Sequence, residues 1–200
     1  MKKYTYLLLL SLAFLIMGCN SGTTASSGTP TPSTRLLVAA SPAGQIRLTH
    51  FTTSDHIQLT GLMYGQGKTM VICTHMAGTT KSVWTDSGMP QRLASLGYSV
   101  LAFDFRGNGD SQGEDDPSTI DVDLRGAITF AQQQGATSIV LMGASMGGTA
   151  ALKVASEVPV TAVISLSAPQ SYGVQVTNNE LQNLPWHCTR HSHPVWWPRL

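Results

Sequence analysis

Four continuous apolar runs, separated by helix-like stretches, constrain the fold of this chain most. The runs are KTMVICTH (68–75), YSVLAFDF (98–105), TSIVLMG (137–143) and VTAVISLSA (160–168). Because they have no polar face, they are typical of parallel strands that helices cover on both sides. Helix cap and stop signals lie between them, at Gly97, Ser118 and Gly135. We therefore predict an α/β fold, a mainly parallel sheet with helices on both faces.

The residues before these runs predict a second kind of strand. Segments 45–53 and 56–65 alternate apolar and polar residues and are separated by Ser54-Asp55. This alternation indicates an antiparallel pair with one exposed face, next to the parallel strands.

Length and charge limit the classes of function. The chain has 200 residues, 42% of them hydrophobic, which favours one domain with a real core. The formal net charge is +1 and only 12% of residues are charged. No basic stripe is visible, so we expect no nucleic-acid partner.

The N-terminal residues predict export and a lipid anchor. Two lysines precede an apolar run that is too short for a comfortable membrane span, so residues 1–18 are typical of a signal peptide. Its end, LIMGC, resembles the bacterial lipobox, which implies lipidation at Cys19 and a membrane-anchored lipoprotein of the cell envelope. The alternative is an ordinary signal peptide with an incidental cysteine. Residues 19–44, rich in Ser, Thr and Pro, are predicted to be a flexible tether.

Ser145 is the candidate nucleophile. It is the centre of GASMG (143–147), which fits G-x-S-x-G and lies between an apolar strand and a helix rich in small residues. Such a sharp strand-to-helix turn exposes the serine, and its glycines allow neighbouring chain to approach. The alternative is a turn without chemistry. A phosphate loop is disfavoured, because no lysine follows as that motif requires.

Backbone N–H groups near this serine could stabilise an oxyanion. One belongs to Met146, at the start of the helix, where the helix dipole favours negative charge. Others lie in THMAGTT (74–80), directly after the first buried strand, where Gly78 would let the loop bend.

Three ordered motifs resemble the α/β-hydrolase superfamily. Besides GASMG, HMAG (75–78) looks like that family's oxyanion loop, and DFRGNGDSQG (104–113) looks like its D-x-R-G-x-G-x-S segment. The resemblance covers about 45–171 and implies that Ser145 is the catalytic nucleophile. It also implies an oxyanion hole formed by the amides of Ala77 and Met146, with Met76 as a third candidate.

Other polar residues near the motifs favour structural roles. The resemblance makes His75 a loop residue rather than a base. Asp104 precedes Arg106 closely, which predicts a bracing ion pair, and residues 114–116 are expected to form a solvated loop that caps the next helix. Cys73, within an apolar run, is expected to be a small buried hydrophobe.

The C-terminal residues do not supply the rest of a catalytic triad in the expected order. The family places an acid after its seventh strand and a histidine after its eighth, and the residues beyond Ser167 are too few for two more units of about 30 each. LPWHCTRHSHPVWWPRL (184–200) has no acid and no strand-like alternation. We therefore interpret 45–184 as a partial domain that lacks the last two strand-helix units. Residues 185–200 would be an aberrant tail, created by a shift of reading frame near Leu184.

Three other interpretations of the tail stay open. His187, His191 or His193 could serve as the base of a shortened hydrolase, with Glu180 as the nearest carboxylate. Cys188 and two of these histidines could hold a metal, although such sites usually need a fourth ligand. A naturally disordered tail is the third. We expect no cofactor and no metal.

These motifs together predict a serine hydrolase. It would act on small ester or other acyl substrates through a Ser145 acyl-enzyme, and it would be crippled here by loss of the acid and histidine. The alternative is a noncatalytic or misfolded remnant.

Overall fold

The computed structural model describes residues 46–182, 184 and 187–190, which contain one seven-stranded sheet and one small hairpin. The predicted leader, Cys19 and the tether lie outside these residues. The sheet strands are β1 (Arg47–Thr52), β2 (Gln58–Tyr64), β3 (Thr69–Thr74), β4 (Ser99–Phe103), β5 (Ser138–Ala144), β6 (Ala162–Leu166) and β9 (His187–Arg190). The helices are α1 (Ser82–Thr85), α2 (Met89–Ser95), η1 (Pro117–Thr119), α3 (Ile120–Gln133), α4 (Met146–Ala155) and α5 (Asn178–Gln182).

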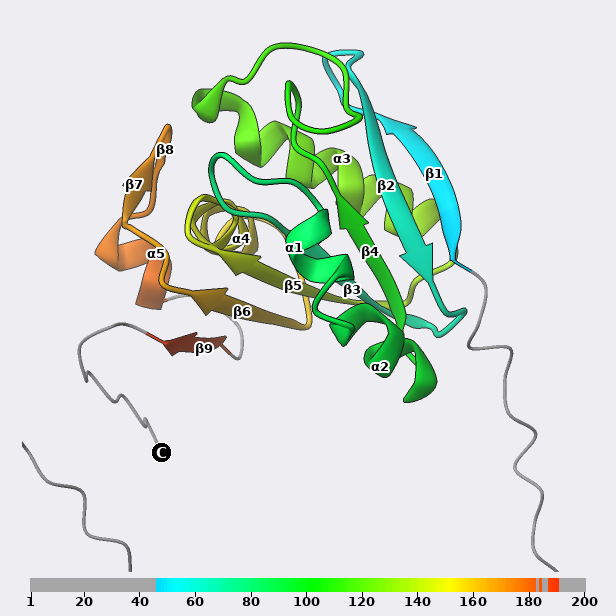
Figure 1. Ribbon diagram of the computed structural model, residues 1–200. Helices are drawn as coiled ribbons and strands as arrows, with labels where there is room; N and C mark the ends of the chain where they lie inside the picture. The colour runs from blue at the N-terminus through cyan, green and yellow to red at the C-terminus, as the bar shows by residue number, and fades with distance from the viewer. Residues whose placement is uncertain (1–45, 183, 185–186, 191–200) are drawn as a thin grey trace, which may run out of the picture. The chain divides into compact units, whose positions relative to one another are not determined.

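The order of strands in the sheet is β1-β2-β4-β3-β5-β6-β9 (Figure 1). β1 pairs antiparallel with β2, and β2 with β4, whereas every pair from β4 to β9 is parallel. The predicted antiparallel pair and mainly parallel sheet are both confirmed. The C-terminal ends of the parallel strands therefore share one edge, the usual place for a site in such sheets.

Alternate residues of the central strands point into two separate cores. Met70 and Ile72 of β3 pack with the apolar faces of α3 and α4. Val71 and Cys73 pack instead with Trp84 of α1 and with residues of α2. This explains why these strands read as continuous apolar runs, since both faces are covered.

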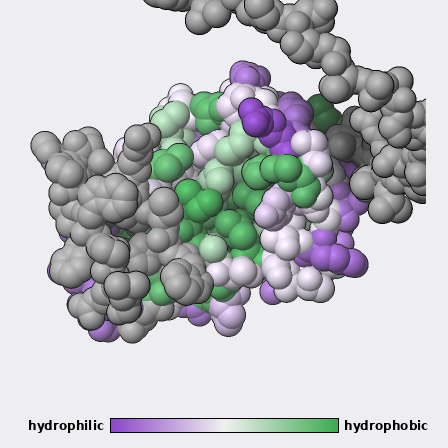
Figure 2. Space-filling view, turned by 90° about the horizontal axis from the view of Figure 1, so that it is seen from below, coloured by the Kyte–Doolittle hydropathy of each residue, from purple (hydrophilic) through white to green (hydrophobic). Residues whose placement is uncertain are grey.

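The side of the sheet that carries α1 and α2 is less covered at β5 and β6. Every second residue there is only partly buried: Val140, Met142, Ala144, Ala162, Ile164 and Leu166. Figure 2 shows hydrophobic side chains gathered on the side seen from below.

No helix in the described part of the chain has the combined length and hydropathy of a membrane span.

The chain after β6 contains a strand that the sequence did not lead us to expect. A short hairpin, β7 (Ser171–Tyr172) with β8 (Val174–Gln175), precedes α5. β9 then pairs in parallel with β6, with His187 opposite Val163 and Arg190 opposite Leu166. The expectation that 184–200 holds no strand was therefore wrong for 187–190. Such a strand is formed by main-chain pairing with the neighbouring strand, which side-chain alternation need not signal.

The start of α3 also differs from the sequence prediction. Ser118 is not the cap; instead the carboxylate of Asp116 accepts the N–H of Ser118 at 2.9 Å and caps η1, which leads into α3. The prediction that the 114–116 loop caps the following helix is confirmed in this form.

Arg106 ties the turn between β1 and β2 to α3. Its guanidinium lies 2.6 Å from Asp55 Oδ2 and 2.7 Å from Asp123 Oδ1. The main-chain N–H of Arg106 also donates to Asp123 at 2.9 Å. The predicted pairing of Arg106 with Asp104 was wrong, because Asp104 pairs with Lys81. Sequence proximity did not reveal the partners of Arg106 and Asp104, because Asp55, Asp123 and Lys81 belong to three other segments of the chain.

Asp55 is expected to make stability depend on pH. The hydrogen bond from Arg106 lowers the pKa of Asp55 from 3.8 to about 2. Because the folded-state pKa is the lower one, this stabilisation is present above about pH 4 and is lost as pH falls through 2. Between these values, urea midpoints of the wild type should fall more steeply than those of Asp55→Asn. Asp86→Asn, which removes an exposed carboxylate, is the control and should keep the wild-type slope; equal slopes for wild type and Asp55→Asn would contradict this prediction.

Candidate active site

Ser145 occupies the turn between β5 and α4 with a strained backbone. Its φ is 49° and its ψ is −118°, a conformation that residues with a Cβ rarely adopt. Its N–H donates to the carbonyl oxygen of Leu166 on β6 at 2.9 Å, which fixes the turn to the sheet. The predicted strand-to-helix turn is thus present at the C-terminal edge of the parallel strands. The side chain is partly exposed, so a substrate can reach it.

Two glycines allow the chain to pack closely beneath this turn. A Cβ on Gly143 would overlap the carbonyl oxygen of Gly147, and a Cβ on Gly147 would overlap the carbonyl oxygen of Thr74. Gly147 N–H donates to the His75 carbonyl oxygen at 3.1 Å, and Thr74 Oγ1 donates to the Gly147 carbonyl oxygen at 2.9 Å. The start of α4 is therefore bonded directly to the end of β3.

These bonds bring the candidate oxyanion donors to one place. The N–H groups of Met76, Ala77 and Met146 donate to no residue that the structure describes. Met146 N–H lies at the positive end of α4, next to Ser145, while Met76 and Ala77 follow the carbonyl that holds Gly147. Gly78 has a φ of 68°, which lets the loop turn. N–H groups of this kind, without a partner in the described part of the chain and close to a turn that exposes a serine, are candidates to stabilise negative charge on a substrate oxygen.

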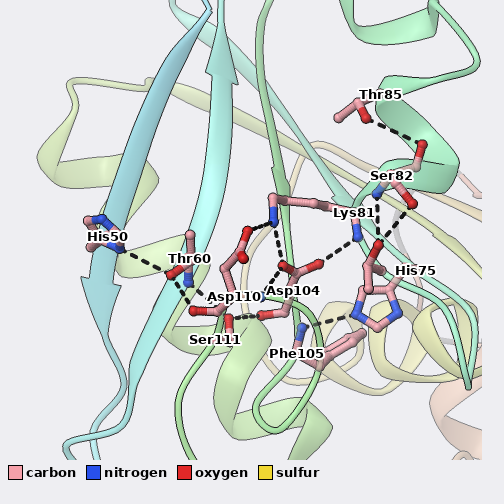
Figure 3. Close-up of polar contacts among 11 residues, drawn as sticks. His50, Thr60, His75, Lys81, Ser82, Thr85, Asp104, Phe105, Asp110 and Ser111 are labelled. Carbon is pink, nitrogen blue, oxygen red and sulfur yellow. Dashed lines mark hydrogen bonds and ion pairs between the residues drawn. The ribbon is translucent and has the colours of Figure 1, made fainter.

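His75 has a structural role, as the resemblance implied. It is fully buried, and both ring nitrogens have backbone partners: Nδ1 lies 2.8 Å from the Met76 carbonyl oxygen, and Nε2 accepts the Phe105 N–H at 3.1 Å (Figure 3). The proton is therefore on Nδ1. Burial lowers the pKa of His75, which keeps the ring neutral.

Ser145 Oγ has no hydrogen-bond partner among the described residues. His50 instead contacts Thr60 Oγ1 at 3.1 Å, and His56 lies in the β1–β2 turn with a φ of 67°. His187 belongs to β9, while His191 and His193 lie outside the described residues. The structure therefore places Ser145 at the same edge of the sheet as the candidate donors, but it does not test the candidate bases or the metal ligands of the tail.

Two further residues have structural partners. Glu180 lies 2.6 Å from Lys153 on α4, and this contact together with Thr177 lowers the pKa of Glu180 to about 2. Its described partners are thus Lys153 and the N–H and hydroxyl of Thr177. Cys73 is fully buried, and burial raises its thiol pKa to about 12, so it packs as a small apolar residue.

Asp104 and Lys81 form a polar cluster that the sequence did not reveal. Asp104 is fully buried, and its carboxylate accepts the main-chain N–H and the ammonium of Lys81, each at 2.6 Å. Asp110 Oδ2 lies 2.6 Å from the same ammonium. No local spacing signals this contact, because the partners come from loops after β3 and β4.

Gly147→Ala is expected to lower the free energy of unfolding by about 2 kcal/mol or more, because the new Cβ would overlap main-chain atoms of Thr74 and His75. The matched control is Gly88→Ala. Gly88 has a φ of 71° and no atom within 4 Å of a built Cβ, so only left-handed strain of about 1 kcal/mol applies. Urea unfolding measures both, and equal losses would contradict the close approach.

Comparisons with known proteins agree with this geometry. A family model described as the alpha/beta hydrolase family matches residues 71–198. Among solved structures, the esterase Pf2001 of Pyrococcus furiosus is 26% identical, with a TM-score of 0.58, over 62% of this chain and 53% of that one. DcsB, solved with a substrate analogue, is 25% identical, with a TM-score of 0.58, over 64% of this chain and 46% of that one. No curated protein matches.

A third similar structure supports the fold alone. Epoxide hydrolase A of Mycobacterium thermoresistibile is 24% identical, with a TM-score of 0.54, over 62% of this chain and 40% of that one. The chain thus spans about half the length of the first two solved structures that it resembles, 53% and 46%. Since the family model covers more than half of its residues, and the parallel sheet carries Ser145 on the expected turn, this chain belongs to the alpha/beta hydrolase family.

Proposed function

We propose that the chain performs serine hydrolase chemistry on ester or other acyl substrates. The observation that carries this proposal is the strained turn that exposes Ser145 at the edge of the sheet where three N–H groups have no partner among the described residues. The similarity to an esterase at 26% identity supports the same class of substrate. The family as a whole supports hydrolysis of small molecules.

In the proposed reaction, Ser145 Oγ attacks the substrate carbonyl carbon. The carbonyl oxygen becomes an oxyanion that accepts hydrogen bonds from the Met146 and Ala77 amides, with Met76 as a third candidate. The serine proton passes to a base, the carbon–oxygen bond of the ester breaks, and the alcohol leaves with that proton. Water then cleaves the acyl-enzyme, which releases the acid and restores the serine.

A fluorophosphonate probe tests the proposed nucleophile. We expect the folded wild type to be labelled at one residue, and Ser145→Ala to abolish the label. The control is Ser167→Ala, because Ser167 is also exposed and has a positive φ of 53° but lies after β6 rather than before a helix. A folded, monomeric wild type that stays unlabelled would overturn the proposal and favour a noncatalytic chain.

We also propose that Cys19 carries lipid and anchors the protein at the bacterial cell envelope. The support is the LIMGC sequence after an apolar leader. In bacterial cells, the wild type should fractionate with membranes and incorporate labelled palmitate. Cys19→Ser should lose the label, while the control Cys188→Ser should keep it. Unchanged labelling of Cys19→Ser would contradict lipidation at this residue.

A further inference from the structure

We propose that Asp104 is a positioning residue for loop 76–80, and through it for the amides of Met76 and Ala77. The inference rests on the proposed function, because it assigns those amides to the oxyanion. Asp104 directly follows β4, whereas the loop begins one residue after β3, beyond His75. These are neighbouring parallel strands, so their C-terminal ends lie side by side.

Two consecutive residues after β4 hold both ends of the loop. At one end, Phe105 N–H donates to His75 Nε2 at 3.1 Å. At the other end, Asp104 Oδ1 accepts the Lys81 N–H, and Oδ2 accepts Lys81 Nζ, each at 2.6 Å (Figure 3). The residues that flank 76–80 on either side are therefore fixed to one point of the sheet.

The loop itself has few other contacts to hold it. Its described hydrogen bonds reach no further than residues 75–83, such as those from Thr79 to the Met76 carbonyl oxygen. Met76, Ala77 and Gly78 are exposed, and a Cβ built on Gly78 has no neighbour within 4 Å. Because 76–78 are exposed and make no hydrogen bond to another element among the described residues, we expect the position of this loop to depend on its two ends.

Burial and charge make Asp104 the stronger of the two carboxylates around Lys81. Asp104 is 0% exposed and also accepts the Asp110 N–H at 3.0 Å, whereas the Asp110 side chain is 69% exposed. Charge-assisted hydrogen bonds to a buried carboxylate are strong, while an exposed ion pair contributes little. Burial alone would lower the pKa of Lys81, but the two carboxylates raise it, so the ammonium stays charged.

The test compares Asp104→Ala with Asp55→Ala in the full chain. Asp55 also forms a short ion pair, with Arg106, but it does not contact loop 76–80. One readout is the ¹⁵N order parameter of the Met76 and Ala77 amides, which reports fast backbone motion without any need for activity. The other is fluorophosphonate labelling, separated into the maximal rate and the half-saturating probe concentration.

We expect Asp104→Ala to lower the order parameters of both amides and to leave those of the β strands unchanged. The maximal labelling rate should fall by about tenfold or more. The fall should not exceed the loss of rate that removal of one oxyanion donor causes. The half-saturating concentration should change less than about twofold, because binding of the probe's apolar group is unaffected. Asp55→Ala should match the wild type in both readouts.

A second pair of variants covers the case in which Asp104→Ala does not fold. Lys81→Met removes the ammonium but keeps the main-chain N–H that Asp104 accepts, so it should give a smaller effect of the same kind. Lys81→Arg should restore much of it, because it restores the charge. Wild-type order parameters in Asp104→Ala, or in Lys81→Met if the first variant is unfolded, would overturn the inference. A wild type that is not labelled would overturn the proposed function only, because the order parameters test the positioning role of Asp104 separately.

Discussion

The close approach of β3 to the start of α4 is the constraint on which the rest of the site depends. It exists because Gly147 has no Cβ to separate its backbone from the carbonyl oxygens of Thr74 and His75. Two hydrogen bonds of 2.9 and 3.1 Å then join the segments. Ser145, the positive end of α4 and the loop after His75 consequently share one edge of the sheet. Without this contact only the Met146 N–H would stay next to Ser145, because the Met76 and Ala77 amides belong to the loop that the contact holds.

Ion pairs hold the part of the loop that this backbone contact does not reach. The contact at Gly147 fixes the first residues of the loop, while Asp104 and Lys81 fix its far end from the neighbouring strand. A second ion cluster, around Arg106, ties the β1–β2 turn to α3 and does not reach the loop. Buried ion pairs are costly to desolvate, and these two connect segments that are distant in the sequence.

The sequence predicted the features that depend on local pattern. The buried strands are apolar runs because both their faces are covered. The five adjacent residues of GASMG are enough to predict the turn at Ser145. The predictions that failed concern pairings between segments that are distant in the sequence. The partner of Asp104 is Lys81 rather than Arg106, and 187–190 pairs with β6 through main-chain groups that no side-chain pattern encodes. The sequence predicted that loop 114–116 caps the following helix, but it indicated Ser118 rather than Asp116 as the capping residue.

His75 shows why residue type near a nucleophile does not establish a base. A general base needs a ring nitrogen that can accept the serine proton. Nε2 of His75 already accepts the Phe105 N–H, and Nδ1 donates to the Met76 carbonyl oxygen, so protonation at Nε2 would break the first bond and leave two donors facing each other. Burial adds the cost of a charge without water. In the proposed reaction the proton of Ser145 must therefore pass to a group other than His75, and this histidine holds the start of loop 76–80.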